Sequence, residues 1–120
     1  MTSLDMNKLS NVNAARCESP TGFNHPMEEW SIAEWTNAIC GEAGEAANLA
    51  KKIIRTRAGV RGNSGTKEQY EAELAKELAD IVLYCDLTAT KLGIDLWSTD
   101  GAVAKKFNEV SDKIGSELKL

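Results

Sequence analysis

Apolar residues recur along this chain at spacings of three and four, which is the period of an amphipathic α-helix and not the alternation of a strand. The spacing predicts four helices, over residues of about 3–17, 31–56, 67–92 and 96–114. Two capping boxes mark helix starts at Ser31 (S-x-x-E) and Thr66 (T-x-x-Q), because their side chains can satisfy free amides of the first turn. We therefore expect an all-α fold, a four-helix bundle whose second and third helices run antiparallel.

Each predicted helix has an apolar face that we expect to form the core. In the first helix this face consists of Leu4, Leu9, Val12 and Ala15, and in the third of Leu74, Leu78, Ile81, Cys85, Thr88 and Leu92. In the fourth helix it consists of Val103, Phe107, Val110 and Ile114. In the second helix the stripe contains Trp35, Ile39, Ala46, Leu49 and Ile53, and one acidic residue, Glu42, lies in its middle.

Four acidic residues form two short pairs, Glu42 with Glu45 and Glu77 with Asp80. Residues three apart lie roughly 60° apart around a helix, so each pair directs both carboxylates to the same side. An unpaired carboxylate in an apolar face is costly, and a matching pair recurs on the helix expected to lie opposite. Hard oxygen ligands of this kind suit Mg²⁺ or Mn²⁺, and protein-bound Mg²⁺ often contacts substrate phosphate. The pairs therefore predict a metal site for phosphate chemistry.

Composition restricts the classes of protein to consider. A chain of 120 residues that is 42% hydrophobic is expected to form one domain, residues 1–120. Its net charge of −4 argues against nucleic acid as a partner, because such binders need a basic surface. Three cysteines without C-x-x-C spacing favour a reducing cytoplasm, and no stretch is long and apolar enough to predict a membrane partner.

Three simpler interpretations of the acidic pairs remain open. They can form a solvated acidic flank, which is common on helices. They can also be neutralised by ordinary salt bridges with Lys51, Lys52 or Lys76. A di-iron bundle would need E-x-x-H pairs, and the chain has one histidine, His25, in a predicted loop.

Three segments together resemble the MazG-like branch of the all-α nucleoside triphosphate pyrophosphatases. They are G-E-A-G-E-A at residues 41–46, E-L-A-D-I-V-L-Y at 77–84 and L-G-I-D-L at 92–96. The order and separation of these motifs carry the resemblance, which covers residues of about 23–108. It implies Mg²⁺-dependent hydrolysis of an NTP or dNTP between the α and β phosphates, giving monophosphate and pyrophosphate, as in cleaning or control of nucleotide pools.

The resemblance also implies roles for individual residues. Glu42, Glu45, Glu77 and Asp80 would be both the metal ligands and the catalytic residues, and the sequence does not say which carboxylate accepts the proton of the attacking water. The candidate substrate-binding residues are His25, Trp30, Lys52, Tyr84, Lys105 and Asn108. The last two resemble a K-x-x-N element that binds phosphate or sugar, and a solvated face of the fourth helix is the alternative.

The sequence gives less information on which base of the nucleotide the protein prefers. Phe-Asn-His-Pro at residues 23–26 resembles the F-H-x-P segment of relatives that act on deoxycytidine nucleotides, but it differs in the position of His25. Trp30, just before the second helix, is the better candidate for stacking on a base. A narrower dCTP or dUTP pyrophosphatase is therefore an alternative, and a non-catalytic, metal-binding interaction module is another. The resemblance and the short chain further predict a homodimer or homotetramer.

Overall fold

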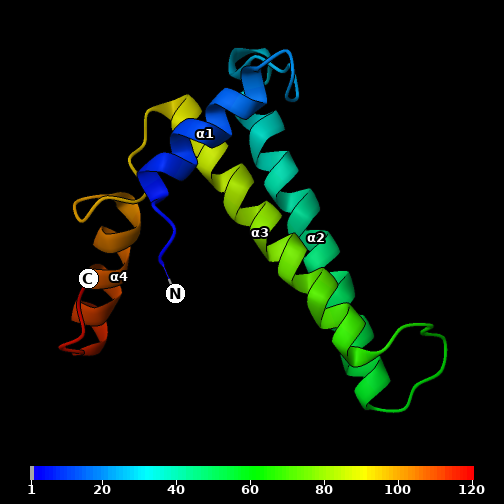
Figure 1. The fold of residues 1–120 in the computed structure, drawn as a ribbon. Coiled ribbons are helices and arrows are strands. Elements are labelled where there is room, and N and C mark those ends of the chain that lie inside the picture. Colours follow the sequence, from blue (N-terminus) through cyan, green and yellow to red (C-terminus); the bar gives the residue numbers. More distant parts are fainter. Residues whose placement is uncertain (1) are drawn as a thin grey trace. The chain divides into compact units, whose positions relative to one another are not determined.

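The computed structural model describes residues 2–120, and these contain four α-helices, one short 3-10 helix and no strand (Figure 1). In chain order the elements are α1 (Met6–Glu18), η1 (Met27–Glu29), α2 (Ile32–Arg57), α3 (Lys67–Leu92) and α4 (Ala102–Ile114). The prediction of an all-α fold is confirmed. No helix within residues 2–120 combines the length and the apolar character that crossing a membrane requires.

The chain divides into two compact units. One consists of residues 30–85, and the other of residues up to 29 together with 86–120. Helix α3 belongs to both, because its residues 67–85 lie in the first unit and its residues 86–92 in the second. The prediction of a single helical domain over residues 1–120 stays a prediction.

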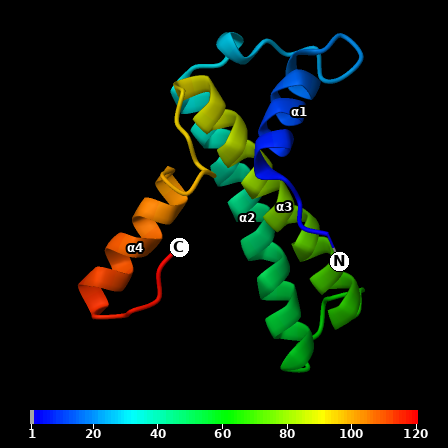
Figure 2. The ribbon, with the colours of Figure 1, turned by 60° about the vertical axis from the view of Figure 1, so that its left-hand side comes forward.

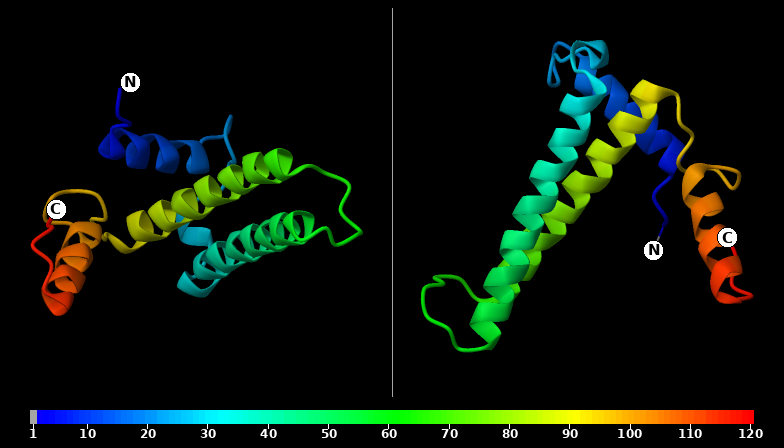
Figure 3. Two further views of the ribbon diagram at one scale, coloured as in Figure 1. Left: turned by 90° about the horizontal axis from the view of Figure 1, so that it is seen from below. Right: turned by 180° about the vertical axis from the view of Figure 1, so that it is seen from behind.

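In the unit formed by residues 30–85, α2 and α3 lie side by side and run antiparallel (Figures 1 and 3). The ring centroids of Trp35, early in α2, and Tyr84, late in α3, are 6.4 Å apart. At the other end of the pair, the ammonium of Lys52 lies 5.7 Å from the ring centroid of Tyr70. These two contacts can form together only if the helices run in opposite directions, so the predicted antiparallel pairing is confirmed.

The core of this pair includes Trp35, Ala46, Leu49 and Tyr70, each less than 9% exposed. Three of these residues belong to the predicted stripe of α2, which is confirmed at those positions. Two residues of the predicted stripe of α3 are exposed instead, Leu78 at 52% and Leu92 at 42%. The helix pair therefore leaves apolar surface uncovered on α3.

Both predicted capping boxes are present and fix where the two long helices begin. Ser31 Oγ accepts a hydrogen bond from the Glu34 amide at 3.2 Å, and the Glu34 carboxylate accepts one from the Ser31 amide at 2.7 Å. The side chains of Thr66 and Gln69 form the same reciprocal pair at 3.2 and 2.8 Å. The caps satisfy amides that lack an intrahelical acceptor, and so determine where α2 and α3 begin.

In the other unit, α1 lies against the C-terminal turns of α3 and is held by polar contacts (Figure 2). The Asn13 side chain donates a hydrogen bond to the Asp86 carboxylate at 2.9 Å, and the Ser10 hydroxyl donates a short one. Asn13 is buried, whereas Leu4 and Val12 are 65% and 56% exposed. The predicted apolar packing face of α1 is therefore wrong at these two positions, because hydrogen bonds to a buried carboxyl group orient the helix.

Helix α4 also packs through a face other than the predicted one. Ala104 and Ser111 are its buried residues, and both have small side chains. The predicted core residues of this helix, Val103, Phe107, Val110 and Ile114, are between 44% and 73% exposed. The expectation that they form the core within one chain is therefore wrong.

The start of α4 differs from the predicted residue 96 and lies at Ala102. The Asp95 carboxylate accepts hydrogen bonds from the amides of Trp97 and Ser98, both at 3.1 Å, which holds the chain in a turn. Gly101 is the N-cap residue of α4, and a Cβ added at this position would lie 2.9 Å from the carbonyl group of Leu96. This local side-chain bonding competes with helix formation, so α4 begins later along the chain than predicted.

Candidate metal centre

The predicted acidic residues of α2 and α3 meet where the two helices face each other. Glu42, Glu45 and Glu77 each offer a carboxylate oxygen, and these three atoms lie within 4.8 Å of one another. Glu42 and Glu77 are half-buried, and Glu45 is exposed. The antiparallel pairing thus brings together three of the four predicted ligands in one unit of the chain.

The fourth predicted ligand, Asp80, is not part of this group. It follows Glu77 by three residues on α3 and is half-buried. The structure therefore places Asp80 on the same helix surface, one turn further along, without bringing its carboxylate within 4.8 Å of all three others. Its role as a metal ligand stays a prediction.

In the ionised carboxylates, two oxygen atoms of this group have no hydrogen-bond partner within residues 2–120. They are Oε2 of Glu42 and Oε2 of Glu77, and both are buried. Buried polar atoms are nearly always satisfied, and an unsatisfied carboxylate oxygen carries the full cost of losing water. Because the three carboxylates lie so close together, a divalent cation is a group that would satisfy them at once. The donor set therefore fits Mg²⁺ or Mn²⁺.

Crowding of the three carboxyl groups alters their acid–base behaviour. A hydrogen bond between protonated Glu77 and Glu42 is the largest cause that raises the pKa of Glu77, followed by a hydrogen bond with Glu45. Loss of water and repulsion by both neighbours act in the same direction, and together they raise this pKa from 4.5 to about 7. Without a cation, the group thus retains a proton at pH values at which an isolated glutamate has lost it.

The alternative of ordinary salt bridges is not supported in the part of the chain that the structure describes. The ion pairs found there do not include any of the three glutamates or Asp80. Lys52, one of the lysines considered, lies over the ring of Tyr70 instead. Within the described residues, no ion pair with a lysine therefore neutralises the negative charge of the three glutamates.

Aromatic side chains follow the same helix pair toward the start of α2. Trp30 contacts Trp35 edge to face, with ring centroids 4.8 Å apart, and Trp35 in turn contacts Tyr84. Trp35 is only 1% exposed and serves the core, whereas Trp30 and Tyr84 are half-buried. Of the two tryptophans, Trp30 retains surface that a base can reach.

Lys52, a predicted substrate-binding residue, lies toward the opposite end of the helix pair. Its ammonium contacts Tyr70, and its backbone carbonyl accepts a hydrogen bond from Asn63 at 2.8 Å. Asn63 belongs to the loop of residues 58–66, and the Tyr70 hydroxyl accepts a bond from the Gly65 amide of that loop at 2.8 Å. The contacts of Lys52 are therefore those of a residue that anchors the loop.

The other predicted substrate-binding residues belong to the second unit. His25 Nε2 is 3.8 Å from the Glu29 carboxylate, and the His25 side chain is 23% exposed. Lys105 is exposed on α4. The side-chain amide of Asn108 is engaged with the backbone of Leu120, at 2.8 and 3.0 Å. Substrate binding by these three residues stays a prediction.

Sequence analysis missed the most buried carboxyl group of the chain, that of Asp86. It is 1% exposed and accepts hydrogen bonds from Ser10, from Asn13 and, at 2.9 Å, from the indole of Trp97. A signal was available, because Asp86 is the one charged residue among positions 81–90. Since three donors satisfy it, Asp86 joins α1, α3 and the turn before α4 and is not part of the candidate metal centre.

Comparison of the chain with models of known protein families gave no match, and comparisons with curated proteins and with solved structures gave none either. The resemblance to MazG-like pyrophosphatases therefore rests on the sequence motifs.

Proposed function

We propose that this protein is a Mg²⁺-dependent nucleoside triphosphate pyrophosphohydrolase of the MazG-like type. The observation that carries the proposal is the group of three carboxylates within 4.8 Å, two of whose oxygens are buried without a partner. A site of this kind has a surplus of negative charge, so it binds a polyanion such as a triphosphate only together with divalent cations. The resemblance of the sequence motifs favours nucleoside triphosphates over other phosphate compounds as the substrate.

The three carboxylates are suited to different tasks. Glu42 and Glu77 are half-buried and oppose each other across the helix pair, which suits them to hold the cation. When bound, Mg²⁺ would offset charge on the triphosphate and lower the pKa of a coordinated water. Glu45 is exposed, so its carboxylate can reach a substrate-bound water and is our candidate for the group that accepts its proton. Asp80, the next acidic residue along α3, is proposed as a further ligand.

The aromatic residues supply a surface for the base. Trp30 keeps part of its ring exposed and rests on Trp35, which fixes its orientation. Tyr84 lies one turn beyond Asp80 on α3, so it can line the same surface. Stacking tolerates different bases, which favours a broad NTP or dNTP preference over a narrow one.

The decisive experiment is incubation of the purified protein with a panel of NTPs and dNTPs, with and without Mg²⁺. We expect nucleoside monophosphate and pyrophosphate in equal amounts, and only with the cation present. Glu42→Gln and Glu77→Gln should each lower kcat by at least about a hundredfold, because each removes a ligand charge. The matched control is Glu73→Gln, an exposed acid one turn before Glu77, which should retain activity.

The same panel tests the two alternatives. One dominant substrate, dCTP or dUTP, would identify the narrow-specificity enzyme. A non-catalytic metal-binding module would show stabilisation by Mg²⁺ that depends on Glu42 and Glu77, without turnover of any nucleotide. Retention of full activity in both glutamine variants would refute the site.

A further inference from the structure

Basic residues are concentrated in one short stretch of the chain. Residues 51–67 contain six of its 14 basic residues and none of its 18 acidic ones. The structure gathers these six at one end of the α2–α3 pair, on the last turns of α2, in the loop of residues 58–66 and at the first residue of α3 (Figure 1). Residues 51–67, here called the basic tip, are thus strongly positive although the net charge of the chain is −4. The six are Lys51, Lys52, Arg55, Arg57, Arg61 and Lys67.

Hydrogen bonds hold the loop of the basic tip against α2. The Asn63 side chain donates to the Lys52 carbonyl at 2.8 Å. A guanidinium nitrogen of Arg55 donates to the Arg61 carbonyl at 2.8 Å, and the Val60 amide donates to the Arg55 carbonyl at 2.9 Å. The basic residues of the loop and of α2 therefore lie together on one surface, within one unit of the chain.

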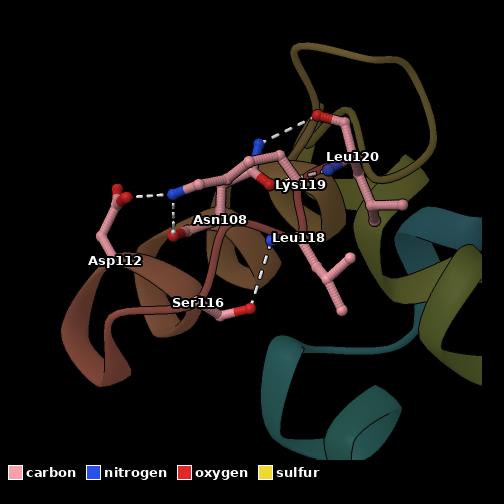
Figure 4. Close-up of polar contacts among 6 residues, drawn as sticks. All are labelled: Asn108, Asp112, Ser116, Leu118, Lys119 and Leu120. Atoms are coloured by element: carbon pink, nitrogen blue, oxygen red, sulfur yellow. Dashed lines mark hydrogen bonds and ion pairs between the residues drawn. The ribbon is translucent and has the colours of Figure 1, made fainter.

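Three basic side chains of the tip are exposed and form no hydrogen bond or ion pair within residues 2–120. They are Lys51, Arg57 and Arg61. Other exposed lysines are paired, as Lys67 is with Glu71 at 2.7 Å and Lys119 is with Asp112 (Figure 4). The three charges are therefore available to a partner outside the chain.

Helix dipoles explain only part of this charge. Arg55 and Arg57 lie in the last turn of α2, where a cation stabilises the helix. Lys67 begins α3, where the positive end of the dipole disfavours a cation, and Arg61 lies outside both helices. The charge of the basic tip therefore exceeds what its helices need.

Two exposed aliphatic side chains lie among these charges. Ile54 is 55% exposed and Val60 is 48% exposed, and the bond from Val60 to Arg55 keeps the loop residue beside the last turns of α2. Residues 51–67 contain no aromatic residue. Single-stranded nucleic acid is usually bound with aromatic side chains on which bases stack, whereas anionic membranes attract basic residues that flank apolar ones. The composition of the tip thus favours a lipid surface.

We propose that the basic tip is a docking surface for an anionic membrane. Lys51, Arg57 and Arg61 contact the lipid headgroups, and Ile54 and Val60 enter the boundary between headgroups and acyl chains. Attachment of this kind needs no membrane-spanning helix. The acidic residues all lie outside the tip and are repelled by the same surface, so the tip is the part of the chain that approaches it. The proposal does not depend on the proposed catalytic function.

Sedimentation of the purified protein with lipid vesicles tests the proposal. We expect binding to vesicles of equal parts phosphatidylcholine and phosphatidylserine, and no binding to phosphatidylcholine alone. Bound protein should be released at about 1 M salt, where the Debye length is about 3 Å. Arg57→Gln and Arg61→Gln should each lower the partition coefficient about fivefold, because each removes one charge near the surface. Val60→Thr should lower it about two- to fourfold, because a hydroxyl replaces a methyl group that enters the boundary.

The charge-matched control is Lys8→Gln, which removes an exposed lysine of α1 and should leave the partition coefficient unchanged. Circular dichroism of each variant checks that the helices are retained. Failure of the wild type to bind the anionic vesicles would overturn the proposal, as would an equal loss of binding in Lys8→Gln. Unchanged binding of Val60→Thr would overturn a membrane as the partner. Tighter binding of the wild type to a single-stranded oligonucleotide than to the vesicles would overturn it too, and would identify nucleic acid instead.

Discussion

Two carboxyl groups on α3 lie in opposite chemical environments. Asp86 is surrounded by donors from three side chains, whereas Glu77 faces two other carboxylates. Hydrogen-bond donors stabilise the ionised form of a carboxyl group, and neighbouring carboxylates favour its protonated form. The same residue class therefore serves packing at one position and forms a crowded acidic group at the other.

The raised pKa of Glu77 predicts how stability depends on pH without divalent metal. An unfolded chain releases this proton near pH 4.5, whereas the folded chain retains it up to about pH 7. The contribution of Glu77 to stability is thus fully present below pH 4.5 and is lost as the pH rises to about 7. Urea unfolding in EDTA at a series of pH values should show this fall in the free energy of unfolding.

Glu77→Gln should remove that part of the pH dependence, because glutamine does not titrate. Glu73→Gln, on the same helix, should keep it. Added Mg²⁺ should stabilise the wild type more at pH 7.5 than at pH 5, since the ion must displace the proton to bind. Identical pH profiles for wild type and Glu77→Gln would contradict the assignment.

Asp86→Ala tests the polar junction of the other unit. The change removes the acceptor of hydrogen bonds from the side chains of Asn13 and Trp97, and loss of hydrogen bonding at a buried site costs about 1–3 kcal/mol. We expect a loss of roughly 3 kcal/mol or more in the free energy of unfolding, measured by urea titration. Asp100→Ala, at an exposed acid in the turn before α4, should change it by less than about 0.5 kcal/mol.

At the scale of elements, two glycines differ in the space that surrounds them. Gly44 lies inside α2, where an added Cβ would meet nothing within 4 Å. Gly101 precedes α4, where a Cβ would lie 2.9 Å from backbone atoms of Leu96. A side chain is thus tolerated by the surroundings at Gly44 and excluded at Gly101.

Gly44→Ala should therefore stabilise the protein by about 0.5–1 kcal/mol, because alanine loses less backbone entropy in a helix. Gly101→Ala should destabilise it by about 1–3 kcal/mol, because backbone atoms must shift. Thermal unfolding of the two variants beside the wild type measures both effects. Destabilisation by Gly44→Ala would show that its surroundings are more crowded than the structure indicates.

Helix positions were predictable from sequence where local chemistry determines them. The reciprocal bonds of Ser31 with Glu34 and of Thr66 with Gln69 are formed within four residues, so the starts of α2 and α3 follow from the sequence. The start of α4 also depends on a local bond, that of Asp95, but the apolar period continues through this turn and suggested an earlier start. A periodic pattern alone does not show which side chain interrupts the helix.

Packing faces were harder to predict because they depend on partners far along the chain. α1 is oriented by Asp86, 73 residues after Asn13, and no period in α1 itself encodes this contact. The acidic site was easier to predict from sequence. The spacing places Glu42 with Glu45, and antiparallel pairing of the helices places both opposite Glu77. The position of Asp80 outside that group depends on the detailed helix crossing, which spacing does not specify.

At the scale of the whole molecule, the main unexplained feature is the apolar face of α4. Val103, Phe107, Val110 and Ile114 follow the helical period, as a buried stripe would, yet each is at least 44% exposed. Contiguous exposed apolar side chains of this kind mark interaction surfaces. We propose a second copy of the chain as the partner of this stripe, and the homodimer or homotetramer expected from sequence stays a prediction.

Light scattering coupled to size exclusion should thus give a mass of two or four chains for the wild type. Phe107→Lys places a charge in the centre of the stripe, and it should shift the mass toward one chain because burial of an unpaired ammonium at an interface is costly. Lys106→Ala, at the adjacent exposed position paired with Glu109, should leave the mass unchanged. Circular dichroism of each variant separates dissociation from unfolding. A single-chain mass for the wild type at micromolar concentration would contradict assembly through α4.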